Sequence, residues 1–276
     1  MNPTQVEQKF SDFHEKWIRK LEELFQQLLL AVNVHKRIQS EHVLPPENNN
    51  YTALVNKLTT HHKEYYTIKW AAAHVNVVAF FAPVWITPLE NSYMWITGWK
   101  PSMFLKLLDS LIMQNQHQIC TSRGSLVDLS EEQLKNIESL RLKIKNEEGR
   151  VEREVERQQV AIADPNMVEL AKLVSRTCMN TINIDESGCT MSKVGGLVEV
   201  AMKNVMSGLE KVMKMADCVR LKTLKGVLDI LSPEQSVHFL AATSLIQIQM
   251  RKWGKQRDVN GGEVEVSLEN TTTLFN

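Results

Sequence analysis

The residues of this chain that could support covalent or metal chemistry are too few and too poorly spaced to do so. His61 and His62 are adjacent, so on a helix they would point about 100° apart and could not easily share one metal ion. The dipeptide Gly195-Gly196 lacks the preceding strand and the spacing of a phosphate-binding loop, and no serine stands in a Gly-x-Ser-x-Gly context. The cysteines lack zinc-ligand spacing: Cys120, Cys178, Cys189 and Cys218. We therefore expect a protein that is not an enzyme and that holds no metal.

A run of aromatic residues between Tyr65 and Phe104 offers a different chemistry, the burial of large side chains. Tryptophan and tyrosine have flat apolar bodies with one polar tip, so their concentration builds either a packed corner or a recognition surface. Large exposed tryptophan clusters are rare on monomers, which favours packing and still leaves room for a partial partner groove. The candidate partner-binding residues in this run are Trp70, Trp85, Trp95 and Trp99.

The first helical segment has a second apolar stripe with cations nearby. Its candidate partner-binding residues recur at helical spacing: Phe10, Trp17, Leu21 and Leu24. Calmodulin targets have this pattern, and so do ordinary helices that bury one face in a core. Glu15, Glu22 and Glu23 dilute the basic face, so the core interpretation is favoured and calmodulin is the alternative.

A small basic cluster lies near the end of the last helical segment. Arg251, Lys252, Lys255 and Arg257 could serve nuclear import, although a solvated helix end is the commoner meaning of such a cluster.

Helix signals dominate the elements that must position these residues, and the fold class predicted is all-α, a multi-helix bundle with long amphipathic helices. The sequence predicts helices from the Thr4 capping box to about residue 34, over about 52–81, from the Thr87-Pro88 start, through Phe104, and from the Ser130 cap to about residue 160. An apolar helix near 167–178 and a weakly specified region over 181–196 follow, and then three more helices, the last opened by Ser232-Pro233. The tail over 258–276 is polar and is predicted to be disordered.

Composition limits the classes of function. The chain has 276 residues with 32 basic and 32 acidic side chains, so its formal charge is zero. This balance argues against wholesale attraction to nucleic acid or to an acidic membrane. No secretory signal and no apolar stretch of about 20 residues is visible, which predicts a soluble protein of the nucleus or cytoplasm.

Several motifs in order resemble the Delay of Germination (DOG) domain of plants. They are Tyr-Tyr-x-x-Lys-Trp-Ala from Tyr65, Pro-Val-Trp-x-x-Pro-Leu-Glu-Asn from Pro83 and Trp-x-x-Gly-Trp-Lys-Pro-Ser from Trp95. The segments around Ser130 and from Cys218 to Gly254 are similar to the same family. The resemblance covers residues 3–257, with a possible division into two sub-bundles near 180–196. It is greatest to the stand-alone Delay of Germination-like proteins, and the C-terminal domain of the TGA bZIP transcription factors is related.

The resemblance implies a non-catalytic regulator that binds other proteins in seed dormancy, seed maturation and abscisic acid signalling, and that controls transcription indirectly. Protein phosphatases or TGA-type factors are the partners that it implies. The alternatives are a TGA-like regulator that binds DNA in a sequence-specific way and a developmental factor of the pollen-aperture type.

Two family properties are doubtful for this chain on its residues. Members of the family have been linked to haem through histidines on the last helix, and here Gln247 and Arg251 stand where those histidines are expected. We therefore expect no cofactor. The helix over 134–160 alternates in charge and lacks a basic arm, so direct DNA binding is doubtful as well.

Overall fold

The computed structural model describes residues 3–41, 49–117, 129–179 and 187–259, and these residues form helices without a strand. The all-α prediction is confirmed. The helices run, in chain order, over Pro3–Glu41 (α1), Asn49–Ala73 (α2), Val78–Phe81 (α3), Pro88–Ser92 (α4), Ser102–His117 (α5), Glu131–Val160 (α6), Pro165–Met179 (α7), Ser187–Ile230 (α8) and Pro233–Val259 (α9), with a short 3-10 helix, Ala161–Ala163 (η1), between α6 and α7.

Three of the predicted helix starts have the expected capping geometry. Ser130 accepts the backbone N–H of Gln133 while the Gln133 side chain accepts the N–H of Ser130, and Thr87 with Glu90 forms the same reciprocal pair at α4. Ser232 and Gln235 repeat it at the start of α9. Each box satisfies backbone donors that a helix start leaves unpaired. α1 differs from the prediction, because it begins at Pro3, before the expected cap Thr4.

α1 also runs past its expected end at about residue 34, to Glu41, and two further predictions of helix extent are wrong. The helix expected over 52–81 breaks after Ala73, where the Asn76 side chain donates to Glu7 and accepts from the backbone N–H of Ala79, so it replaces helical hydrogen bonds at the junction. After residue 186 there are two helices instead of three, because α8 continues unbroken for 44 residues. Residues 187–196, part of the proposed sub-bundle division, belong to α8, and the rest of that division and nearly all of the predicted tail lie outside the described residues.

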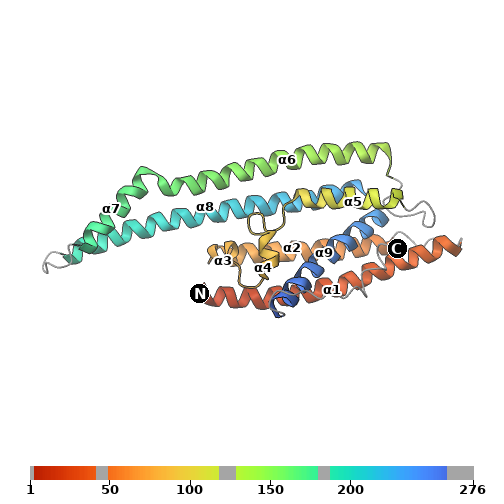
Figure 1. Cartoon of the computed structure of the whole chain (residues 1–276), viewed down its shortest axis with the longest axis horizontal. Helices are drawn as coiled ribbons and strands as arrows, with labels where there is room; N and C mark the ends of the chain where they lie inside the picture. The colour runs from red at the N-terminus through yellow and green to blue at the C-terminus, as the bar shows by residue number, and fades with distance from the viewer. Residues whose placement is uncertain (1–2, 42–48, 118–128, 180–186, 260–276) are drawn as a thin grey trace.

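The helices form a bundle with a projecting arm (Figure 1). α1, α2 and α9 pack against one another, and α5 and the C-terminal half of α8 close the bundle. Leu21, Leu108 and Phe239, from three different helices, are fully buried in the shared core. The arm consists of the C-terminal part of α6, η1, α7 and the N-terminal part of α8, which extend past the bundle. Among the described residues, no helix is both long enough and apolar enough to cross a membrane.

Candidate functional site in the tryptophan elbow

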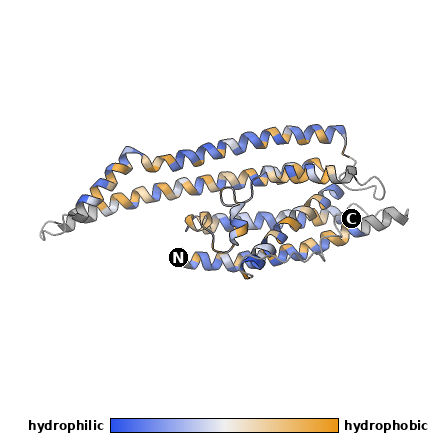
Figure 2. Ribbon diagram, in the orientation of Figure 1, coloured by the Kyte–Doolittle hydropathy of each residue, from blue (hydrophilic) through white to orange (hydrophobic). Residues whose placement is uncertain are grey.

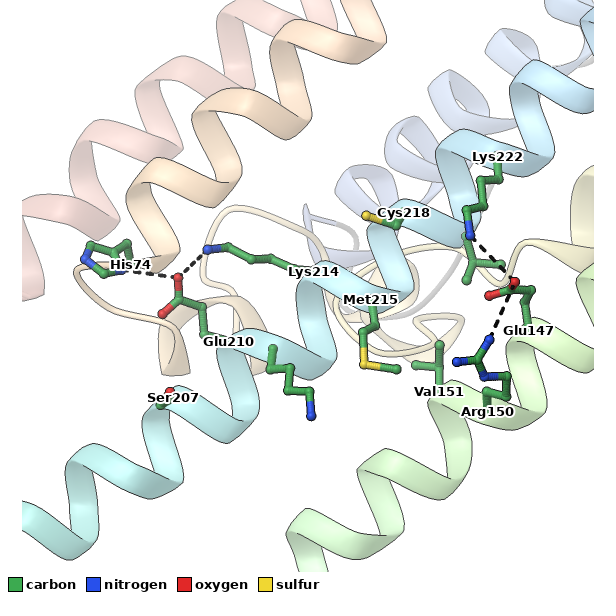
Figure 3. Close-up of a pocket in the computed structure, with 12 residues that line it drawn as sticks. His74, Glu147, Arg150, Val151, Ser207, Glu210, Lys214, Met215, Cys218 and Lys222 are labelled. Atoms are coloured by element: carbon green, nitrogen blue, oxygen red, sulfur yellow. Dashed lines mark hydrogen bonds and ion pairs between the residues drawn. The ribbon is translucent and has the colours of Figure 1, made fainter.

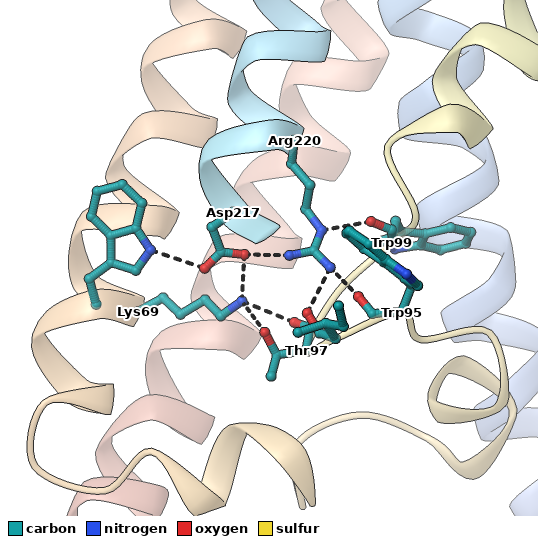
Figure 4. A network of polar contacts seen from close by, with 8 residues as sticks. Lys69, Trp95, Thr97, Trp99, Asp217 and Arg220 are labelled. Atoms are coloured by element: carbon teal, nitrogen blue, oxygen red, sulfur yellow. Dashed lines mark hydrogen bonds and ion pairs between the residues drawn. The ribbon is translucent and has the colours of Figure 1, made fainter. Parts of the chain in front are cut away.

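Lys69 occupies the centre of a buried polar network between α2, α8 and the loop that joins α4 to α5 (Figure 4). Its side chain is 1% exposed, and its ammonium donates to the carbonyl of Thr97 at 3.0 Å, to the Thr97 hydroxyl at 2.9 Å and to Asp217 Oδ1 at 2.9 Å. All three donors of the ammonium are therefore used. The other carboxylate oxygen, Asp217 Oδ2, accepts the indole N–H of Trp70 at 3.0 Å.

Arg220 is the second cation of this network, and it binds the backbone of residues 95–99, which we name the tryptophan elbow. Its guanidinium donates to the carbonyls of Trp99 at 2.6 Å and of Ile96 at 2.8 Å, and also to the carbonyl of Trp95. The same group pairs with Asp217 Oδ1 at 2.6 Å. The planar guanidinium has five N–H donors, so it can bind the three elbow carbonyls and the Asp217 carboxylate together, which is one acceptor more than the three donors of an ammonium could bind.

The elbow has a backbone conformation that needs such support. Ile96 and Thr97 have φ angles of 45° and 60°, in the left-handed region that β-branched residues rarely adopt. A conformation of this kind costs on the order of 1–3 kcal/mol per residue and persists only where surrounding contacts fix it. Here Lys69 and Arg220 bind the carbonyls of these two residues. Gly98 completes the fit, because a Cβ at that position would lie 2.8 Å from Arg220 Cζ.

The electrostatics of the network favour a fixed structural role. Burial lowers the pKa of Lys69 to about 8, although the neighbouring Asp217 carboxylate acts in the opposite direction. Two buried cations share one fully buried carboxylate, and the elbow carbonyls supply the remaining negative dipoles. The charged ammonium of Lys69 has no lone pair, and all three of its N–H groups are bound to acceptors. The arrangement holds the elbow through charged groups that are already paired with one another and with the backbone.

Trp95 and Lys100 connect the elbow to α6. The Trp95 indole N–H and the Lys100 ammonium both donate to Glu152 Oε1, at 3.0 Å and 2.9 Å. The hydrogen bond from Lys100 is the main reason that the pKa of the Glu152 carboxyl lies below its usual range. Trp70, Trp95 and Trp99 are partly exposed, so these three candidate residues keep some surface that a partner could contact.

The structure corrects the assignment of the other five candidates to a binding surface. They are 0–8% exposed and belong to the core: Phe10, Trp17, Leu21, Leu24 and Trp85. The ring centroids of Phe10 and Trp85 are 4.7 Å apart, and the Trp17 indole stacks on His61 at 4.7 Å while its N–H donates to the His61 carbonyl. The physical reason is that the α1 stripe packs against α2 and α9. Calmodulin could reach it only if α1 left the bundle.

A small cavity of about 90 Å³ lies behind the elbow, where α1, α2, α8 and α9 meet. His14 Nδ1 and Gln247 Oε1 are buried at this cavity without a hydrogen-bond partner. The volume corresponds to about three water molecules, so ordered water is the natural partner of these atoms. Gln247 occupies one of the two positions where the resemblance implies a haem-binding histidine. Its side-chain amide is not among the usual axial ligands of haem iron.

Arg251 occupies the other expected haem position. Its burial also removes it from the basic cluster that the sequence predicted. Its side chain is 5% exposed and pairs with Glu15 and, at 3.4 Å, with Glu90, while it donates to the Trp85 carbonyl at 3.1 Å. It fixes α9 to α1 and to the α4 region, and its buried guanidinium is not accessible to an import receptor. Lys252 and Lys255 are half exposed and form ion pairs of 3.4 Å with Glu22 and Glu15, and Arg257 is exposed.

A larger groove of about 630 Å³ between α6 and α8 has a charged rim (Figure 3). Glu210 binds Lys214 at 2.6 Å and His74 at 3.2 Å, and Glu147 lies 3.6 Å from Lys222. Cys218 lies beside these pairs as a free thiol that solvent can reach, and desolvation by its neighbours, with the Asp217 charge, raises its pKa, which makes it a poor nucleophile at neutral pH. Among the described residues, no group of three or more metal-binding side chains comes together.

The sequence reasoning missed the three residues that organise the elbow. Lys69, Asp217 and Arg220 were not candidates, although Lys69 and Arg220 stand inside motifs that carry the family resemblance. The available signal was the spacing of Lys69, four residues after Tyr65, which places the lysine on the same helix face as that aromatic residue. A buried lysine needs a carboxylate partner, and the partner lies 148 residues further along the chain.

Comparison with known proteins gives a consistent result. A family model described as "Seed dormancy control" matches residues 25–110. The chain is 47% identical to Protein DOG1-like 4 of Arabidopsis thaliana, over 91% of this chain and 94% of that protein. It is 25% identical to Protein RESPONSE TO ABA AND SALT 1 of the same plant, over 93% and 100%, and 25% identical to its Transcription factor TGA2, over 84% of this chain and 59% of that protein.

Proposed function

Because this chain belongs to the plant DOG1 seed-dormancy family, we propose that it is a non-catalytic regulator that acts by binding other proteins. Its role lies in seed dormancy or maturation and in abscisic acid signalling, where it controls transcription indirectly, in the nucleus and in the cytoplasm. The observation that carries the proposal is the similarity to DOG1-like 4, which runs along nearly the whole of both chains. The similarity of this chain to TGA factors makes a TGA factor the first partner to test. Protein phosphatases are the second.

The geometry supports a binding role over a catalytic one. The buried charged groups that hold the elbow, on Lys69, Asp217 and Arg220, are paired with one another and with backbone carbonyls. The charged groove between α6 and α8 pairs its carboxylates with lysines. The described residues also offer some apolar and aromatic surface to solvent, in part at Trp95 and Trp99 and more on the arm, and such surface suits protein–protein contacts.

A mobility-shift experiment tests the proposal against direct DNA binding. The full chain is added to a labelled TGA-site DNA with and without a TGA factor. We expect no shift by the chain alone and a further shift of the TGA–DNA complex when both are present. A shift by the chain alone would favour the DNA-binding alternative. Neither shift, together with affinity purification from maturing seed that recovers neither a TGA factor nor a phosphatase, would contradict the proposed function.

We also propose that this member does not use haem, because Gln247 and Arg251 are unsuited to bind iron and the cavity beside Gln247 is small. Titration of the purified chain with haemin, followed at the Soret band, tests this. Gln247→His is the matched variant. A sharp, stoichiometric Soret shift with the wild-type chain would contradict the proposal.

A further inference from the structure

The arm has an apolar face that the rest of the described chain leaves uncovered. Within the bundle, α8 buries Val212, Met213 and Ala216 almost completely, at 0–1% exposure. In the arm the same helix still buries Val194, which lies on this face, but it has a second apolar stripe on another face, where Leu197 is 56% and Val200 is 59% exposed. The exposed apolar residues of the arm therefore lie on a face of this unbroken helix other than the face that the bundle buries (Figure 2).

α7 cannot cover this stripe alone. It packs mainly on α8 and η1, and none of its side chains that the structure describes is fully buried. The two helices leave a groove of about 630 Å³ between them, which we name the arm groove. Its lining is mostly apolar and includes Met167, Leu170, Leu173, Leu197, Val200, Ala201 and Val205, beside the polar residues Gln158, Asn166 and Asn204.

The shape of the arm groove fits a helix. α7 and α8 run antiparallel beside each other (Figure 1), and a third helix laid between two such helices buries an apolar stripe from all three. From Leu197 to Val205 the groove extends about 12 Å along α8, which corresponds to two or three turns of a partner helix.

The charge of the lining selects the partner. Asp164 and Glu169 line the arm groove, and no lysine or arginine is among its lining residues. Glu169 also pairs with Lys172 at 2.8 Å, but both side chains are more than half exposed, so this pair is weak and exchangeable. A second copy of this chain, laid groove to groove, would place carboxylates against carboxylates. A helix with lysine or arginine beside its apolar stripe would instead find complementary charge.

We propose that the arm groove is a docking surface for a basic amphipathic helix of a partner protein. This inference rests on the proposed function, since it names the surface through which such a regulator would bind.

Binding of model helices to the full chain tests the docking surface. Two labelled peptides of about four turns share one leucine stripe, flanked by lysines in one and by glutamates in the other. Fluorescence anisotropy should show the lysine peptide binding about ten-fold more tightly, and L197D/V200D should weaken that binding about ten-fold or more. Glu169→Lys should reduce the preference for lysine. Leu142→Asp is the matched control, because Leu142 is 58% exposed on α6 outside the groove, and it should leave binding unchanged.

Several outcomes would overturn the inference. They are equal binding of the two peptides, undiminished binding by L197D/V200D with native circular dichroism, and a self-dimer in sedimentation that L197D/V200D dissociates. The mobility-shift experiment separates this failure from failure of the proposed function. A chain that shifts the TGA–DNA complex but does not bind the lysine peptide loses the docking surface and keeps the function. If the chain binds the lysine peptide but affinity purification from maturing seed recovers neither a TGA factor nor a phosphatase, the docking surface is supported and the proposed function is contradicted.

Discussion

His14 and His62 are uncharged residues of the bundle core, although histidine often carries a charge on a protein surface. Each is 6–7% exposed. Burial lowers the pKa of His14 to about 3, with Arg251 acting in the same direction and Glu15 against it. Burial also lowers the pKa of His62 to about 4, helped by His61. Protonating either ring would bury a charge, and for His14 the Glu15 carboxylate offsets only part of its cost.

The stability of the fold should therefore fall as the pH falls below about 6.5. The folded pKa values lie below the unfolded value of 6.5, so the unfolded chain binds more protons in this range and stability is lost with falling pH. At pH 5 the loss should be about 2 kcal/mol for each of the two histidines. Urea unfolding at pH 7.5 and pH 5.0 measures it, above the range in which carboxylates titrate. His62→Gln should reduce the difference, and equal stability at the two pH values would contradict the prediction.

At the scale of elements, the elbow is fixed by residues from helices that are distant in sequence. Lys69 comes from α2 and Arg220 from α8, and both bind carbonyls of residues 95–99. Glu148 and Glu152 of α6 bind the same region, at the backbone N–H of Ser102 and at Trp95. The elbow and the residues that follow it are therefore held by side chains from three helices, α2, α6 and α8.

Gly98→Ala should destabilise the protein by about 1–3 kcal/mol, as overpacking does. The added Cβ would lie 2.8 Å from Arg220 Cζ, and the guanidinium cannot move away without breaking its hydrogen bonds to the elbow. Gly195→Ala is the matched control in an open part of α8, where better helix propensity should raise stability by up to about 1 kcal/mol. Chemical unfolding followed by circular dichroism compares the two variants. Similar effects of both would show that the contact with Arg220 is unimportant.

Elements with local signals were the ones that the sequence could predict. Ser130, Thr87 and Ser232 each start a helix through side chains three residues away, and such short-range chemistry can be read directly. The break after Ala73 depends on the contact of Asn76 with Glu7, 69 residues away. The burial of Arg251 depends on Glu15, 236 residues away. Pairings of this range are set by how the helices assemble, and periodicity carries no information about them.

At the scale of the whole molecule, the bundle and the arm differ in how firmly they are packed. α9 buries Val237, Phe239 and Leu240 at 0–1% exposure, whereas α7 has no fully buried side chain among those described. Local opening requires less free energy where fewer apolar contacts are lost.

Amide hydrogen exchange should therefore be faster in α7 than in α9, by about a hundred-fold or more, which corresponds to roughly 3 kcal/mol of opening free energy. Mass spectrometry of deuterium uptake at neutral pH, with peptides over 165–176 and 236–248, measures the difference. The lysine-flanked model helix should slow exchange in α7 and leave α9 unchanged. Equal protection of the two helices in the free protein would contradict the expectation.

The unbroken length of α8 has a mechanical consequence. Leu197 and Asp217 are separated by about 30 Å of continuous helix, with Arg220 one turn further on. A rotation of α8 about its own axis would be carried along the unbroken helix. A ligand that turned α8 at the arm would therefore also turn Asp217 and Arg220 in the bundle. Residues 96 and 97, whose left-handed backbone is held by hydrogen bonds from this network, would be the first part of the backbone to change conformation.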